Sequence, residues 1–124
     1  MTGWTADELA RIGRADEVQI TSRRVDGTLR PFVTIWAARL GDDLYVRSAY
    51  GPDNPWFVRA KASGEGRVRA GGVERDIAFE EPDHAIDGEL HAAYHAKYDR
   101  YGPGIVGTVV SPEAARSTLR LVPR

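Results

Sequence analysis

The chain has 124 residues, of which 42% are hydrophobic and 28% charged, and its 17 Lys and Arg nearly balance its 18 Asp and Glu. These values are typical of one soluble globular domain and exclude disordered and fibrous chains, and the lack of a basic excess argues against nucleic-acid binding. The absence of cysteine excludes disulfides and thiol catalysis, and without a signal peptide or an apolar run of roughly 18–20 residues we expect a cytoplasmic protein that does not enter membranes.

The first third of the chain predicts a short helix followed by a hairpin. Thr5 and Glu8 have the spacing of a capping box, which favours a helix over residues 6–12. Residues 17–24 alternate between apolar and polar side chains, which indicates a half-buried strand. The Asp26-Gly27 pair that follows is typical of a hairpin turn.

Residues 30–40 form the most strand-like run of the sequence. Alternate side chains give this strand two apolar faces, Phe32, Thr34, Trp36, Ala38 and Leu40 on one and Val33, Ile35 and Ala37 on the other. Because a strand with two apolar faces is covered on both sides, we expect the core on one face and a second element or subunit on the other.

The remaining elements complete a strand-rich pattern with helices between hairpins. We expect strands at 44–49, 64–70, 73–80 and 118–122, helices at 56–63 and 85–101, and a helical turn at 112–116. The total is six mostly antiparallel strands and three helices. This order predicts one α+β domain over residues 1–124, built as a small β-barrel.

Nearly the whole chain resembles a family known as domain of unknown function 2255. The resemblance is carried by the stretches WTADELARI, DGTLRPFVTIW, GDDLYVRSAYG, GRVRAGGVERD, AYHAKYDRYG and TLRLVPR. The family has no settled activity, so this resemblance implies a fold more than a reaction.

The order of elements is also similar, more distantly, to the split β-barrels of flavin reductases and pyridoxamine-phosphate oxidases, including the deazaflavin-dependent nitroreductases. A basic hairpin, a Gly-containing loop and a helix beginning Pro55-Trp56 stand in the corresponding places. The chain departs from the nitroreductases where they carry a Gly-Arg/Lys-Lys-Ser-Gly hairpin and where their Asn is Arg59. The resemblance implies a homodimer with a small-molecule cleft between subunits.

A set of arginines and aromatic residues could hold a flavin-type cofactor, either FMN or an F420-like deazaflavin. Such a cofactor needs a flat apolar wall for its ring and cationic donors for its phosphate. Trp36 and Tyr50 could supply the wall, and Arg47 and Arg59 the charge. The full candidate set is Arg30, Trp36, Arg47, Ser48, Tyr50, Trp56 and Arg59. The alternative is that the tryptophans pack in the core and Arg47 pairs with Asp43 or Glu74.

A second pattern places Asp87, His91, His95 and Asp99 four residues apart on the long helix. Two histidines at this spacing can bind one metal, but the Glu of an H-E-x-x-H motif is absent. Steps of four residues also drift by about 40° around a helix. Solvated Asp–His pairs explain the pattern equally well, so we predict no metal site.

A third pattern places Lys97 among tyrosines on the apolar side of the same helix. A lysine beside tyrosines can have a lowered pKa and act in acid–base chemistry, or it can simply extend its ammonium into water. The candidate catalytic residues are Lys97, Tyr98, Tyr101 and His95.

Three functions follow from these patterns. The first is a flavin- or deazaflavin-dependent oxidoreductase that transfers hydride to a small molecule. The second is an enzyme without a cofactor that uses Lys97, Tyr98 or His95 for acid–base chemistry in the same cleft. The third is a ligand-binding module without catalysis. Phosphate-loop, dinucleotide and nucleophile-elbow motifs are absent from the sequence.

Overall fold

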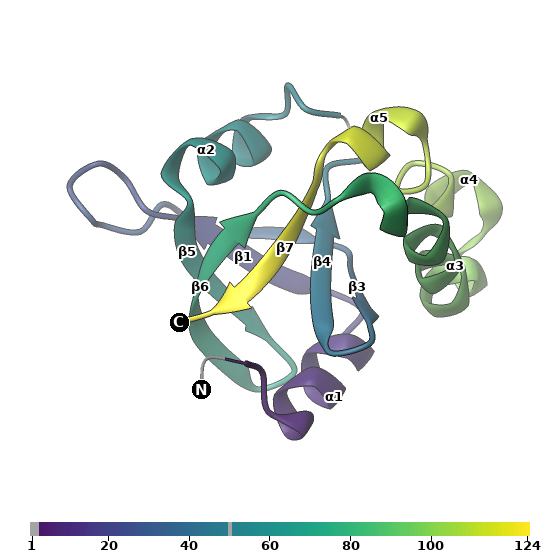
Figure 1. The fold of residues 1–124 in the computed structure, drawn as a ribbon, viewed down its shortest axis with the longest axis horizontal. Coiled ribbons are helices and arrows are strands. Elements are labelled where there is room, and N and C mark those ends of the chain that lie inside the picture. Colours follow the sequence, from purple (N-terminus) through teal and green to yellow (C-terminus); the bar gives the residue numbers. More distant parts are fainter. Residues whose placement is uncertain (1–2, 50) are drawn as a thin grey trace.

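The computed structural model describes residues 3–49 and 51–124 (Figure 1). The strands are β1 (Val18–Ser22), β2 (Val33–Ile35), β3 (Ala37–Leu40), β4 (Asp43–Arg47), β5 (Glu65–Ala70), β6 (Val73–Glu80) and β7 (Thr118–Pro123). The helices are α1 (Ala6–Arg14), α2 (Pro55–Ser63), α3 (Asp87–Tyr98), α4 (Pro103–Val106) and α5 (Pro112–Arg116). Short 3₁₀ turns, His84–Ile86 and Asp99–Tyr101, flank α3.

The strands form one antiparallel sheet in the order β2-β1-β5-β6-β7-β4-β3. The two outermost strands, β2 and β3, are consecutive in the chain and are joined by Trp36 alone. The sheet therefore curls into a nearly closed barrel whose two edges belong to one stretch of chain. This architecture confirms the predicted α+β barrel, with seven strands in place of six.

The predicted strand at 30–40 is interrupted because it has to pair with two different neighbours. Its first half, β2, pairs with β1 through Val33 opposite Ile20, and its second half, β3, pairs with β4 through Ala37 opposite Val46. The chain changes partner at Trp36, where the ladder stops. The alternation of side chains continues across this break, so the sequence pattern alone gives no sign of it.

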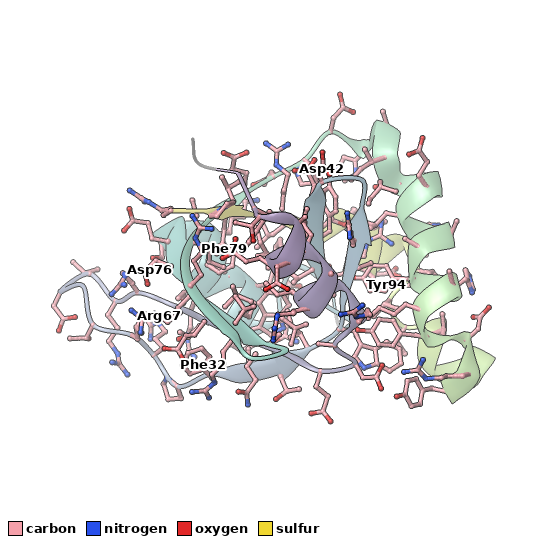
Figure 2. The ribbon with its side chains drawn as sticks, turned by 90° about the horizontal axis from the view of Figure 1, so that it is seen from below. Phe32, Asp42, Arg67, Asp76, Phe79 and Tyr94 are labelled. Atoms are coloured by element: carbon pink, nitrogen blue, oxygen red, sulfur yellow. The ribbon has the colours of Figure 1, made fainter. Side chains whose placement is uncertain are left out.

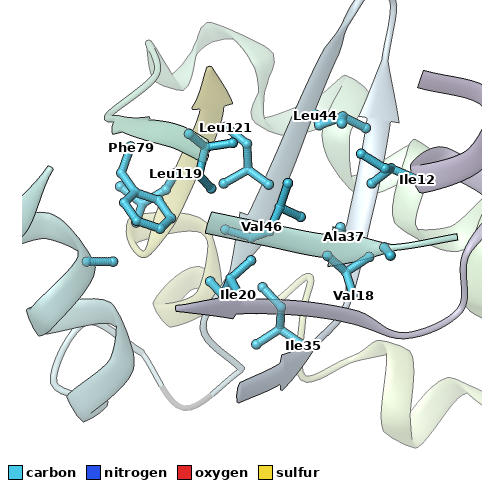
Figure 3. Packing of buried hydrophobic residues seen from close by; sticks show 14 of the residues in the cluster. Ile12, Val18, Ile20, Ile35, Ala37, Leu44, Val46, Phe79, Leu119 and Leu121 are labelled. Atoms are coloured by element: carbon cyan, nitrogen blue, oxygen red, sulfur yellow. The ribbon is translucent and has the colours of Figure 1, made fainter. Parts of the chain in front are cut away.

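The barrel interior is filled by aliphatic side chains from every strand (Figure 3). Val18, Ile20, Leu44 and Val46 are at most 1% exposed, and the inward side chains of the 33–40 stretch join them. Figure 1 shows α1 at one end of the barrel and α2 near the other. Both helices contribute to this core, α1 through Ile12 among others and α2 through Phe57 and Ala60.

A second apolar cluster lies outside the barrel, between β3, β4 and α3. It is made of Ala38, Tyr45, Leu90, Tyr94, Tyr98, Val106 and Val109, with Trp36 and Leu40 packed against it. Figure 2 shows Tyr94 between α3 and the barrel. The outward face of the 33–40 stretch is thus covered by a second element of the same chain, as its two apolar faces predicted.

The local signals at the helix ends are largely confirmed. The Thr5 hydroxyl accepts from the Glu8 amide while the Glu8 carboxylate accepts from the Thr5 amide, which is the predicted capping box. The helix continues to Arg14, two residues beyond the predicted end. The predicted helix at 85–101 is α3 with a 3₁₀ turn at each end. Within residues 3–49 and 51–124, no helix has both the length and the apolar character needed to cross a bilayer.

Two glycines give opposite predictions when replaced by alanine. A Cβ on Gly66 in β5 would lie 1.9 Å from the Thr21 carbonyl oxygen, and one on Gly88 in α3 would meet nothing within 4 Å. We expect Gly66→Ala to lower the free energy of unfolding by about 3 kcal/mol or more, because the backbone of β1 must move. The matched control Gly88→Ala should raise it by about 0.5 kcal/mol through helix propensity. Urea unfolding measures both, and equal effects would contradict the close approach of β1 and β5.

Candidate functional site

Three adjoining pockets form one groove along α2. We call them the tryptophan pocket, about 310 Å³, the middle pocket, about 120 Å³, and the arginine pocket, about 480 Å³. Trp56 lines both the tryptophan and the middle pockets, whereas Arg30 and Arg59 line both the middle and the arginine pockets. The groove therefore runs from an aromatic end to a cationic end.

The tryptophan pocket lies at the break between β2 and β3. It is lined by Thr34, Ile35, Trp36, Arg47, Ala49, Asn54, Trp56, Thr108 and Val109. The Trp36 ring stacks on the Tyr98 ring, with 4.0 Å between centroids and 3° between planes. This stacking fixes the orientation of a flat aromatic wall at one side of the pocket.

Side chains of α3 bind the main chain at the same break. The Tyr94 hydroxyl donates to the Trp36 carbonyl at 3.2 Å, and Lys97 Nζ donates to the Ala37 carbonyl at 2.7 Å. The Ala37 amide donates to the Tyr98 hydroxyl at 3.3 Å. These bonds replace the strand ladder that is lost where the chain changes partner.

Burial shapes the ionisation of this α3 group. Desolvation lowers the pKa of Lys97 to about 8 and raises the pKa of Tyr94 and Tyr98 above the usual value for tyrosine. Beside them, the Asp16 carboxylate accepts from the Tyr101 hydroxyl and pairs with Arg100. The two hydrogen bonds and the charge of Arg100 lower the pKa of Asp16.

The arginine pocket lies between α2 and the hairpin that connects β1 to β2. It is lined by Arg23, Arg24, Arg30 and Arg59, together with the one acidic residue Glu65, which pairs with Arg124. Arg23 pairs with Asp76, but within residues 3–49 and 51–124 no carboxylate lies within 4.0 Å of the Arg30 or Arg59 guanidinium. Arg30 Nε is buried without a hydrogen-bond acceptor. The pocket thus offers unpaired cationic donors, as an anionic ligand requires.

Arg47 belongs to the other end of the groove, and each of its three side-chain nitrogens donates to the protein. Its side chain is 0% exposed, and it donates to the Thr118 hydroxyl at 2.8 Å, the Val109 carbonyl at 3.0 Å and Asp87 at 3.5 Å. The alternative pairing with Asp43 or Glu74 was wrong, because the partner is Asp87 on α3. Desolvation lowers the pKa of Arg47.

The predicted cofactor residues are therefore divided between the pockets. Trp36, Arg47 and Trp56 line the tryptophan pocket, and Arg30 and Arg59 line the arginine pocket. Ser48 is buried and lines none of the three, since its main chain is bonded to Ser117. Tyr50 lies outside the described residues. Arg47 and Arg59, predicted as joint phosphate donors, are not brought together.

The predicted catalytic residues line none of the three pockets. Lys97, Tyr98 and Tyr101 lie together next to Trp36, as the helical spacing predicted, but their polar atoms face main-chain carbonyls or Asp16. His95 is exposed and bonded to Asp99 at 2.8 Å. Among the described residues no cluster of three His, Asp or Glu side chains could hold a metal ion.

Sequence reasoning missed several residues of the groove. Thr34, Asn54 and Thr108 line the tryptophan pocket, and Arg23 and Arg24 line the arginine pocket. Arg23 and Arg24 belong to the basic hairpin that carries the resemblance to the split barrels, but the candidate site did not include them. Asn54 directly precedes Pro55 at the start of α2, and this Asn-Pro pair predicts from the sequence that Asn54 lies at a helix N-terminus.

The sequence comparison identifies one family. The model of a family described as "Uncharacterized protein conserved in bacteria (DUF2255)" matches residues 8–121. Among curated proteins, none matches the sequence significantly.

Solved structures with the same fold match over most of the chain. An F420-H2-dependent reductase has a TM-score of 0.62 at 16% identity and covers 86% of this chain and 93% of its own. A candidate pyridoxamine 5′-phosphate oxidase from Listeria innocua has a TM-score of 0.62 at 17% identity, covering 94% and 90%. A structure described as a domain-swapped dimer has a TM-score of 0.62 at 16% identity, covering 95% and 87%. These similarities show a shared split-barrel fold.

The position of Lys97 predicts a pH-dependent stability. The pKa of the Lys97 ammonium is about 8 in the folded chain and near 10.5 in the unfolded chain, so between pH 8 and pH 10.5 the unfolded chain binds more protons than the folded chain. The free energy of unfolding therefore rises with pH over this range. The gain is complete above pH 10.5 and is lost as the pH falls through 8. We expect the free energy of unfolding of the wild type, relative to Lys97→Met, to rise by about 1–2 kcal/mol between pH 7.5 and pH 10.5.

Urea unfolding at both pH values measures this difference, and subtracting the variant removes the effect of tyrosine ionisation. Lys61→Met is the matched control, because the Lys61 side chain is 55% exposed and pairs with Glu81 at the surface. Parallel pH profiles for the wild type and Lys97→Met would contradict the burial of Lys97.

Proposed function

The chain belongs to the DUF2255 family, and we propose that it binds a flavin- or deazaflavin-type nucleotide in the groove along α2 and acts as an oxidoreductase on a small molecule. One observation carries this proposal: the groove joins an aromatic pocket to Arg30 and Arg59, which have no acidic partner in the part of the chain that the structure describes. A nucleotide cofactor with a flat ring and a phosphate has the same two-part character.

The residues present fit both parts of such a cofactor. The rings of Trp36 and Trp56 offer apolar surface for a planar ring system. Arg30 and Arg59 offer guanidinium donors for a phosphate, and Arg30 Nε is buried without an acceptor. When bound, the cofactor would supply hydride transfer.

The comparisons support this proposal through the fold. One neighbour is described as an F420-H2-dependent reductase and another as a candidate pyridoxamine 5′-phosphate oxidase, both on the same split barrel. At 16–17% identity a shared fold does not imply that this chain catalyses the reaction of either neighbour. The groove of this chain therefore carries the argument, and the neighbours indicate which cofactors to test first.

In this proposal Lys97, Tyr98 and Tyr101 are positioning residues. Tyr98 stacks on the Trp36 ring, Tyr101 lies 5.7 Å from it between ring centroids, and Lys97 binds the next carbonyl along the chain. They act on the ligand through the Trp36 wall. His95, on the exposed face of α3, has no part in the proposed site.

We also propose that the protein is a homodimer. One neighbour with the same fold is described as a domain-swapped dimer. Val25 and Val58, on either side of the arginine pocket, are apolar and are 109% and 49% exposed. A second subunit that covers the groove would bury them.

The cofactor proposal predicts that binding depends on the unpaired arginines. We expect saturable quenching of flavin mononucleotide or F420 fluorescence in the micromolar range by the purified protein. Arg30→Gln with Arg59→Gln should weaken this binding by about 10-fold to 100-fold, since each loses a charge-assisted hydrogen bond. The matched control is Arg14→Gln on α1, at the other end of the barrel, which should bind as the wild type does.

The absence of binding of either cofactor would contradict the proposal and favour a cofactor-independent enzyme or a ligand-binding module. Equal binding by the double variant and the wild type would remove Arg30 and Arg59 from the site. Circular dichroism of each variant, compared with the wild type, tests whether the barrel is folded.

The dimer proposal predicts a particle of twice the 13.7 kDa chain mass. Size-exclusion chromatography with light scattering measures it directly. Val25→Asp with Val58→Asp should shift the particle toward the mass of one chain, because a buried carboxylate opposes association. A single-chain mass for the wild type at micromolar concentration would contradict the proposal.

A further inference from the structure

A buried positive charge lies at the wall of the tryptophan pocket. Arg47 lines this pocket although its side chain is 0% exposed. All three of its nitrogens donate to the protein, to Thr118, Val109 and Asp87. Because the side chain is 0% exposed, the guanidinium lies behind the pocket surface and is not in direct contact with solvent or ligand. A ligand in the pocket therefore experiences the charge through space, where a partly desolvated environment strengthens the field.

The negative partner of this charge lies away from the pocket. Asp87 does not line the tryptophan pocket, and its nearest oxygen is 3.5 Å from Arg47 Nη2. Its other oxygen is 3.1 Å from His84 Nδ1, and its side chain is 28% exposed, so water and His84 share its charge. The pair thus presents its positive end to the pocket and its negative end to the solvent.

The rest of the pocket wall does not cancel this field. Apart from Arg47, its lining residues are uncharged, and they include the two tryptophans. His91 also lies beside the pair, and burial together with the charge of Arg47 lowers its pKa, so its ring is neutral at pH 7.5 and leaves the Arg47 charge uncompensated. The pocket is therefore both aromatic and electropositive.

We infer that the tryptophan pocket selects flat aromatic ligands that carry an anionic group at the edge facing Arg47. This inference deepens the proposed function, on which it rests for its catalytic meaning, because it names the kind of ring system that the Trp36–Trp56 end of the groove accepts. The charge makes the pocket discriminate between an aromatic carboxylate and its neutral counterpart of the same shape.

The test uses a matched pair of probes, naphthalene-2-carboxylate and naphthalene-2-carboxamide, on the full chain without added cofactor. Tryptophan fluorescence at pH 7.5 reports binding of each. We expect the carboxylate to bind at least fivefold more tightly than the amide. Asp87→Asn removes the compensating charge while leaving Arg47, so it should tighten carboxylate binding a further threefold to tenfold and leave amide binding unchanged.

Further variants identify the source of the preference. Arg47→Met should abolish the preference for the carboxylate probe. The double variant Arg59→Gln with Asp87→Asn should still bind the carboxylate more tightly than Arg59→Gln alone, which separates the effect of Arg47 from that of the neighbouring arginine pocket. Equal binding of the two probes by the wild type would overturn the inference. An unchanged preference in Asp87→Asn would overturn it as well, so the test stands even if Arg47→Met does not fold.

The outcome is independent of the cofactor experiment. A carboxylate preference that responds to Asp87→Asn, in a protein that binds neither flavin nor deazaflavin, would support the inference and contradict the proposed oxidoreductase. Cofactor binding without any preference for the carboxylate probe would support the proposed cofactor site and overturn the inference about the tryptophan pocket.

Discussion

The closure of the barrel depends on the main-chain hydrogen bonds that α3 makes at Trp36 and Ala37. One stretch of chain supplies both edges of the sheet, so it must leave β1 and join β4 within a single residue. The polar groups of that residue and the next would otherwise be buried without partners, which is costly. Tyr94, Lys97 and Tyr98 supply those partners from outside the barrel.

The same break creates the proposed site. Because the ladder stops at Trp36, an aromatic side chain stands at a point where two strands separate and α2 passes nearby. The apolar end of the groove is thus a by-product of closing the barrel. Its cationic end comes from unrelated elements, the β1–β2 hairpin and α2, where Arg30 and Arg59 have no carboxylate within ion-pair distance among the described residues.

Much of the fold could be predicted because its signals are local. Side-chain alternation gave the two faces of the 33–40 stretch, and the capping box gave the start of α1. The break at Trp36 could not be predicted, since alternation continues through it. The helical period placed Lys97 at the edge of the core, but it cannot reveal that the partner is a carbonyl 60 residues away. In the same way, the sequence marks Arg47 as a strand arginine in need of a partner without identifying Asp87.

The bonds from α3 to the break also affect how this protein can evolve. Tyr94 and Lys97 bind carbonyl oxygens, which every amino acid possesses, and neither bond depends on the side chain at position 36. A mutation there would exchange one wall of the pocket and remove the stacking partner of Tyr98, but it would leave the bonds from Tyr94 and Lys97 in place. The residue at position 36 can therefore change the ligand that the pocket accepts while Tyr94 and Lys97 still hold the main chain at the break.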